Sequence, residues 1–389
     1  MEGPALAAPL LDGRGKRGAR GGTTWAQTLG NIVVSIVGTE VLGLPYAFRM
    51  AGWLAGSLGV FAAGVSTYLC MLLLVQCRNK LEEDSNVATG ERMQIRSYGD
   101  LGAKAFGTTG RYATELLVLI SQAGVCLSFI HSLSSLAPVS AFADTCNVLA
   151  MAIVIKKDFQ LFDQFSWRRS AFNGAWGLPF AGGVALFCFE GFSMTLALEA
   201  SMADRKKFRW VLLMAFIAIT IIYVCFGIFG FLAYGDDTKD IITLNLPNDW
   251  SAISVKVGLC VALAFTFPIM MHPIYEIIEM KLSSIGWFEK LRLNARAERL
   301  GHQAARVLVL VAVAVVASCI PGFGAFISLV GSTVCALLSF VLPATFHLLL
   351  VGSEVQLWQR AMDYFIIAFG LAFAAYGTYD ALSDHRLGS

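Results

Sequence analysis

Long apolar blocks dominate the sequence, and they restrict the chain to one class of protein. Charged residues avoid these blocks, whose lengths are near the roughly 20 residues that a helix needs to cross about 30 Å of hydrocarbon. The whole chain is 57% hydrophobic and 14% charged, whereas a soluble domain is about 25% charged. We therefore predict an all-α polytopic membrane protein.

Ten blocks qualify as candidate spans. They cover about 25–49, 53–77, 112–136, 138–155, 179–201, 210–234, 252–280, 304–320, 323–350 and 360–382. The block at 138–155 only just reaches spanning length, so a re-entrant segment is an alternative there. Residues 1–24 are rich in glycine, alanine and arginine, and we predict that they form a disordered basic tail on the cytoplasmic side.

Two of these spans contain matching interruptions. Gly38–Pro45 holds two glycines and a proline, which cost a continuous helix about 1 and about 3 kcal/mol each relative to alanine. The span at 179–201 is interrupted at Cys188–Ser193, with Glu190 and Gly191 at the centre. Broken helices in corresponding positions of two halves are typical of transporters built from inverted repeats, with the substrate near mid-membrane.

Opened helices also indicate the class of substrate. One half begins with exposed N–H groups and the other ends with exposed C=O groups, so the two ends carry opposite partial charges. A free amino acid presents a carboxylate and an ammonium group that match these ends. The residues expected to bind it are Gly38, Thr39, Glu40, Val41, Leu42, Gly43, Ser121, Phe189, Glu190, Gly191, Phe192 and Phe265.

Three ionisable residues near the breaks are candidates for proton coupling, namely Glu40, Glu190 and His272. Glu190 has the alternative role of capping backbone N–H groups at its own break. His272 precedes Pro273, and a structural hydrogen bond to nearby carbonyls is the favoured interpretation of it. An interhelical hydrogen bond explains Ser121 as well as a place in the site does.

Three stretches resemble the amino acid/auxin permease family. Val37–Phe48 with Ala51–Trp53 resembles its first helix, and Leu186–Gly191 with Leu198–Glu199 resembles its sixth. Phe265–Glu276 resembles its eighth helix in the form found in plant vacuolar neutral amino acid transporters. The resemblance covers most of the chain. It implies a LeuT-like inverted-repeat fold of the APC superfamily, usually with eleven spans.

The resemblance also implies a function. It is proton-linked secondary active transport of small neutral amino acids by alternating access, in the vacuolar membrane or, as an alternative, in another membrane of the cell. The partners expected are the amino acids, protons and membrane lipid, without nucleic acid. An enzyme is disfavoured and no cofactor is expected, because no pair of His, Cys or Asp residues stands at ligand or catalytic spacing inside the spans.

The count of spans departs from the family pattern. Within a transmembrane domain of 25–389, the first repeat at about 25–155 supplies four candidate spans and the second at about 179–350 supplies five. An extra C-terminal span follows at about 360–382. About ten spans are therefore predicted where the family has eleven, and one helix of the first repeat is expected to be absent.

The basic loops support the same interpretation. Loops rich in Lys and Arg share the cytoplasmic side, so an even number of crossings should separate 78–111 from 205–209. Three candidate spans lie between them. By resemblance, the family's fourth helix is missing between about Phe129 and Leu136. The alternative function is therefore a non-transporting or impaired splice-type variant that acts as a sensor or binds partners.

Glu40 is the second departure, because the family generally carries glycine at this place. A carboxylate there repels the substrate carboxylate and costs about 2.5–3.5 kcal/mol at the bilayer centre. Two interpretations follow. Either Glu40 is protonated and serves proton coupling, or it weakens transport, and we favour the second.

Overall fold

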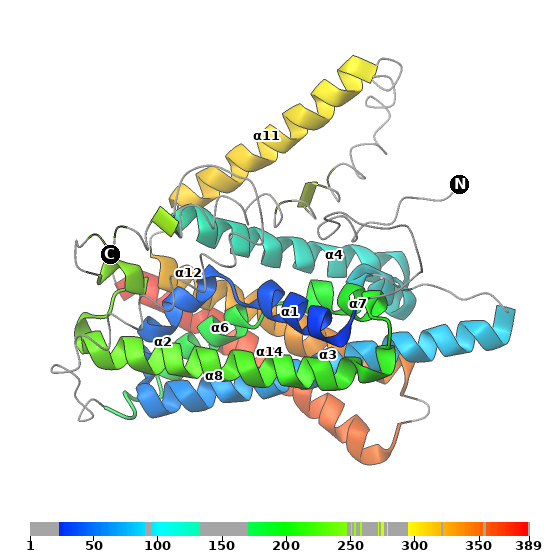
Figure 1. Ribbon diagram of the computed structural model, residues 1–389, viewed down its shortest axis with the longest axis horizontal. Coiled ribbons are helices and arrows are strands. Elements are labelled where there is room, and N and C mark those ends of the chain that lie inside the picture. The colour runs from blue at the N-terminus through cyan, green and yellow to red at the C-terminus, as the bar shows by residue number, and fades with distance from the viewer. Residues whose placement is uncertain are drawn as a thin grey trace.

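The computed structural model shows a bundle of helices (Figure 1). It describes residues 23–89, 95, 97–132, 170–246, 250, 253, 257–258, 271, 274–275, 278, 295–319, 322–352 and 355–387, and these residues contain no strand beyond one isolated bridge. The all-α prediction is confirmed for this part of the chain. Residues 1–22 of the predicted tail, the predicted span at 138–155 and most of the predicted span at 252–280 lie outside it.

The first half of the chain forms five elements. They are α1 (Trp25–Ile36), the 3₁₀ helix η1 (Thr39–Gly43), α2 (Leu44–Ala51), α3 (Trp53–Thr89) and α4 (Tyr98–Ser132). A capping box starts α1, because Gln27 N donates to Thr24 Oγ1 at 3.3 Å and Thr24 N donates to Gln27 Oε1 at 3.0 Å. α4 bends at Gly107, whose φ of 68° favours glycine.

The second half forms the remaining elements. They are α6 (Gly177–Cys188), α7 (Phe192–Ser201), η3 (Arg205–Lys207), α8 (Phe208–Tyr234), η4 (Gly235–Asp237), η5 (Ile242–Leu244), α11 (Ala295–Cys319), α12 (Phe323–Val330), the π-helical η6 (Gly331–Cys335) and η7 (Leu337–Val341), α13 (Leu342–Leu350) and α14 (Leu357–Leu387). The single bridge pairs Thr23 with Met202, so the start of α1 lies beside the end of α7.

α6 lies at the centre of the bundle, where it packs against α2, α3, α12 and η6. Nine of its twelve residues are buried, so most of this helix contacts protein. α3 and α8 run side by side along the long axis, whereas α11 slants away from the bundle (Figure 1).

Five helical stretches in the described residues are long and apolar enough to cross a membrane. They are Trp53–Ser85, Gly177–Ser201, Arg205–Asp237, Phe323–Leu350 and Leu357–Asp380. On α8, large side chains recur on one exposed face, at Trp210, Met214, Ile217 and Ile221. Exposed apolar side chains at helical spacing suit contact with lipid chains, so the structure is that of a multi-pass membrane protein.

One buried ion pair joins α3 to α7. Arg78 is fully buried, its guanidinium pairs with Glu199, and Nη1 donates to Leu196 O at 3.3 Å. Arg78 Nε also lies 3.4 Å from Glu82 Oε1, which in turn pairs through Oε2 with the exposed Arg205 at 3.3 Å. These contacts fix the end of the second broken helix to a continuous one.

We expect Arg78→Ala to lower the free energy of unfolding by about 3–5 kcal/mol, because it leaves the Glu199 carboxylate buried without its partner. Arg205→Ala is the matched control, and it should cost less than about 1 kcal/mol because this pair is exposed. Thermal unfolding of the purified variants in detergent measures both. Equal shifts for the two variants would contradict the structural role given to Arg78.

Candidate substrate site

The predicted interruption in the first span is present. α1 ends at Ile36, Val37 and Gly38 are extended, and η1 then leads into α2. Pro45 stands in the first turn of α2, where its missing N–H group costs nothing. The chain therefore changes from helix to extended backbone and back within a few residues.

The predicted interruption in the second span is also present. α6 ends at Cys188, and α7 begins at Phe192. Between them, Phe189 N still donates to Ala185 O at 3.1 Å, whereas Gly191, with φ of −176° and ψ of 10°, lies outside the helical region. Both breaks that the sequence indicates are thus real openings of a helix.

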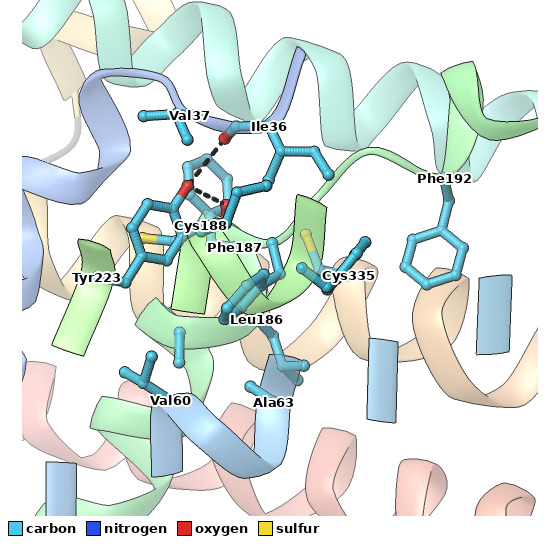
Figure 2. Close-up of a cluster of buried hydrophobic side chains, with 14 of the residues drawn as sticks. Ile36, Val37, Val60, Ala63, Leu186, Phe187, Cys188, Phe192, Tyr223 and Cys335 are labelled. Atoms are coloured by element: carbon cyan, nitrogen blue, oxygen red, sulfur yellow. Dashed lines mark hydrogen bonds between the residues drawn. The ribbon is translucent and has the colours of Figure 1, made fainter. Parts of the chain in front are cut away.

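Tyr223 of α8 joins the two breaks. Its hydroxyl lies 2.9 Å from Ile36 O and 3.0 Å from Cys188 O, and its one proton is shared between these two carbonyls, which belong to the last residues of α1 and α6 (Figure 2). Ile36 O also accepts from Gly38 N at 3.1 Å. One hydroxyl therefore satisfies carbonyl groups that both helices leave open.

Aromatic rings pack beside the ring of Tyr223. Phe189 stacks on Phe216 with centroids 5.8 Å apart, and it lies 5.1 Å from the ring of Tyr223. Phe189 and Phe192 are both fully buried. The two phenylalanines that the sequence assigns to the site are thus part of the core packing around the second break.

Glu40 lies in the first turn of η1 and is 7% exposed. Its carboxylate folds back over Gly38, so closely that a Cβ atom on residue 38 would overlap Oε2 of Glu40. Val41 and Leu42 point into the hydrophobic core, and Gly43 is buried. Of the residues predicted on η1, Glu40 therefore brings a polar side chain to the first break. For Thr39 the structure describes the helical backbone.

Glu190 occupies the second break and is 8% exposed. Oε1 of its carboxylate has no hydrogen-bond partner among the described residues, and the buried Ser121 of α4 lies nearby. The Ser121 hydroxyl also lies 3.8 Å from Cys335 Sγ, and Gln122 Nε2 donates to Ser193 Oγ at 3.4 Å. α4, η6 and the second break thus meet around Glu190.

Glu40 and Glu190 are both buried, one at each break. In the part of the chain that the structure describes, no ion pair joins Glu40 or Glu190 to a Lys or Arg side chain. Two buried carboxylates thus stand at the two breaks without a basic partner there. A bound cation or protons would balance this charge.

Two predicted site residues, Phe265 and His272, lie outside the described residues. Tyr223 and Cys335, by contrast, contact the site but are missing from the residues that the sequence indicates. The signal for Tyr223 is a tyrosine hydroxyl within an apolar span, since a buried hydroxyl needs a partner. Cys335 carries no such signal, because a cysteine in an apolar helix is usually a small core residue.

Comparison with known families gives one match across the chain. The family described as "Transmembrane amino acid transporter protein" matches residues 21–130 and 125–383. The two matched segments meet at 125–130, next to the place where the sequence predicts a missing helix.

Individual relatives are amino acid transporters. Amino acid transporter ANT1 of Arabidopsis thaliana is 51% identical over 92% of this chain and 92% of its own length. Amino acid transporter AVT3B of the same plant is 35% identical over 92% of this chain and 93% of its own. Vacuolar amino acid transporter 3 of Schizosaccharomyces pombe is 25% identical, over 97% of this chain and 61% of its own length.

The alignments also bear on the missing helix. The alignment with ANT1 extends over 405 positions, which is more than the 389 residues of this chain. The relative therefore contains residues that have no counterpart here.

Removing the hydroxyl of Tyr223 tests its place between the breaks. Tyr223→Phe takes away the donor to Cys188 O, and we expect a loss of about 1–3 kcal/mol in the free energy of unfolding, the cost of a buried unsatisfied group. Tyr364→Phe is the control, since Tyr364 is 64% exposed. Thermal unfolding in detergent distinguishes them, and an unchanged melting temperature for Tyr223→Phe would refute the bridge.

Proposed function

Because this chain belongs to the amino acid/auxin permease family of transmembrane amino acid transporters, we propose that it is a proton-linked secondary transporter of neutral amino acids. The observation that carries the proposal is the pair of broken helices that Tyr223 holds together. Alternating access around these breaks is the corresponding mechanism.

The ends of the broken helices support an amino acid as substrate. The carbonyl ends of α1 and α6 meet at Tyr223, and they provide the negative side of a site for an ammonium group. The backbone after Gly38 and Gly191 starts the second halves, and its N–H groups provide the positive side for a carboxylate. A zwitterion matches both sides at once.

The surroundings support a neutral side chain on that substrate. Ile36, Val37, Phe187 and Phe192 are buried apolar residues at or beside the breaks (Figure 2). Neither break has a Lys or Arg ion pair among the described residues, so an acidic substrate side chain would find no counter-charge there. An apolar or small side chain carries no such cost.

Two carboxylates are candidates for the proton link. Glu190 and Glu40 are both buried at the breaks, and ionisable groups inside a membrane protein mark ion and proton pathways by default. Glu190 is the stronger candidate because Oε1 of its carboxylate has no hydrogen-bond partner among the described residues. Glu40 instead lies over Gly38 and reduces the attraction of the first break for a substrate carboxylate.

We propose that the protein resides in the vacuolar membrane. The support is one relative, the Schizosaccharomyces pombe protein, whose name places it among vacuolar amino acid transporters. It also agrees with the resemblance of the segment around His272 to plant vacuolar transporters.

Flux through reconstituted vesicles tests the transporter directly. We expect labelled alanine or proline to move faster with a pH gradient than without one. Glu190→Gln should lower the gradient-driven rate about tenfold or more, which corresponds to about 1.4 kcal/mol or more in the barrier. Glu83→Gln, a change at an exposed residue of α3, is the control. The absence of alanine and proline flux under both conditions would contradict the proposal that this chain is a transporter.

A second candidate function is that of an impaired or non-transporting variant that senses amino acids or binds partners. The observation in its favour is the split family match at 125–130 together with alignments longer than the chain. Loss of one span would invert every later loop relative to the N-terminus and disturb the symmetry of the repeats.

Cysteine labelling decides between the two topologies. A cysteine at Gln303, an exposed position of α11, reports the loop at 281–306, and a cysteine at Lys16 reports the tail. If one helix is missing, an impermeant maleimide should reach these two positions from opposite sides of the membrane. Labelling of both from the same side would exclude the inverted topology.

A further inference from the structure

Four basic residues stand together where α8 begins. All four are exposed, and they occupy η3 and the first turn of the helix: Arg205, Lys206, Lys207 and Arg209. The backbone of this basic cluster is fixed on both sides. Asp204 caps η3 by accepting from Lys206 N at 3.2 Å, and the side chain of Phe208 is buried in the core. The cluster therefore holds its positive charge at a defined place on the surface.

Carboxylates balance two of these four charges. Arg205 Nη1 lies 3.3 Å from Glu82 Oε2, and Lys207 Nζ lies 3.3 Å from the carboxylate that caps η3. In the part of the chain that the structure describes, no ion pair reaches Lys206 or Arg209. Two cations are therefore left for an anion from outside the protein.

The apolar side chains that follow the basic cluster on α8 face lipid. Trp210, Met214, Ile217 and Ile221 are exposed, and they recur every three or four residues along one face of the helix. Lys206 precedes Trp210 by four residues, which is about one helical turn. A lipid whose acyl chains lie along this stripe therefore has its headgroup at the basic cluster.

Two tryptophans mark the boundary of the membrane at the same end of the bundle. α1 packs against α8, and each helix carries an exposed tryptophan in its first turn, Trp25 in α1 and Trp210 in α8. The bridge between Thr23 and Met202 puts the start of α1 beside the segment that leads into α8. Because tryptophan side chains gather where the membrane meets water, the basic cluster lies at the level of the lipid headgroups.

We propose that Lys206 and Arg209 bind the headgroup of an anionic phospholipid, whose acyl chains lie along Trp210 and the exposed apolar residues that follow it on α8. Ammonium and guanidinium groups both donate charge-assisted hydrogen bonds to phosphate oxygens. A zwitterionic headgroup gains less here, because its own cation offsets the attraction. This lipid site lies on the outer face of α8, whereas Tyr223 of the same helix is buried at the two breaks. Lipid binding can therefore be measured separately from transport.

Phosphatidylserine and phosphatidylcholine with the same acyl chains form a matched pair of probes. Native mass spectrometry of the purified full-length protein, released from detergent micelles that contain equal amounts of both lipids, measures how much of each stays bound. Each basic residue near an anionic lipid headgroup favours binding about fivefold, so we expect the unaltered chain to prefer phosphatidylserine about twentyfold. Lys206→Gln and Arg209→Gln should each lower this preference about fivefold, and the double variant should bind the two lipids about equally.

Charge reversal at the two ends of α8 provides the control. Lys206→Glu should abolish the preference for phosphatidylserine. Lys239→Glu changes the net charge by the same amount at an exposed residue beyond the opposite end of the helix, and it should leave the preference unchanged. The melting temperature of each variant shows that it is folded, as expected for substitutions of exposed side chains.

Three results would overturn the lipid site. They are equal retention of the two lipids by the unaltered chain, an equal loss of preference in Lys206→Glu and Lys239→Glu, and displacement of phosphatidylserine by inorganic phosphate at the same concentration. The last result would show that the basic cluster binds free anions, since inorganic phosphate makes no use of the apolar stripe on α8.

Discussion

The arrangement of this protein depends on one hydroxyl group. Tyr223 stands between the last carbonyls of α1 and α6, and it lets two helices end at the same point inside an apolar core (Figure 2). Without a donor, a carbonyl at that depth would lack a partner, and water is not available to replace it. The breaks are therefore a consequence of the packing of α8 as much as of the glycines and proline in the breaks themselves.

Close packing around the breaks explains the glycines there. A Cβ atom on Gly191 would lie 3.0 Å from Cγ1 of Ile36, so the start of α7 approaches the end of α1 with no room to spare. Gly331 lets η6 approach the backbone of α6, Gly183 lets α6 approach the backbone of α12, and small residues at such crossings are typical of membrane helices. Dense packing on these sides holds the two breaks close to their neighbouring helices inside the core.

Charged side chains are arranged differently at the two ends of α7. α7 is tied at its far end to α3 by Arg78 and Glu199, where cation and anion balance. At the breaks, by contrast, Glu40 and Glu190 are both acidic, and neither has a Lys or Arg ion pair among the described residues. Charge is thus compensated where α7 is anchored and left open where the two opened helices meet, as expected if a ligand or protons complete the site.

The sequence alone determined that this is a helical membrane protein, because apolar length sets the spans, and it located both breaks, because glycine and proline weaken a helix wherever they stand. The positions of Glu40 and Glu190 at the breaks could likewise be predicted, since each carboxylate stands inside an interrupted apolar span. Only the tertiary structure decided which groups meet. Tyr223 is 187 residues from Ile36 and Arg78 is more than 100 residues from Glu199, and contacts at such separations depend on how whole helices pack, which no local pattern encodes.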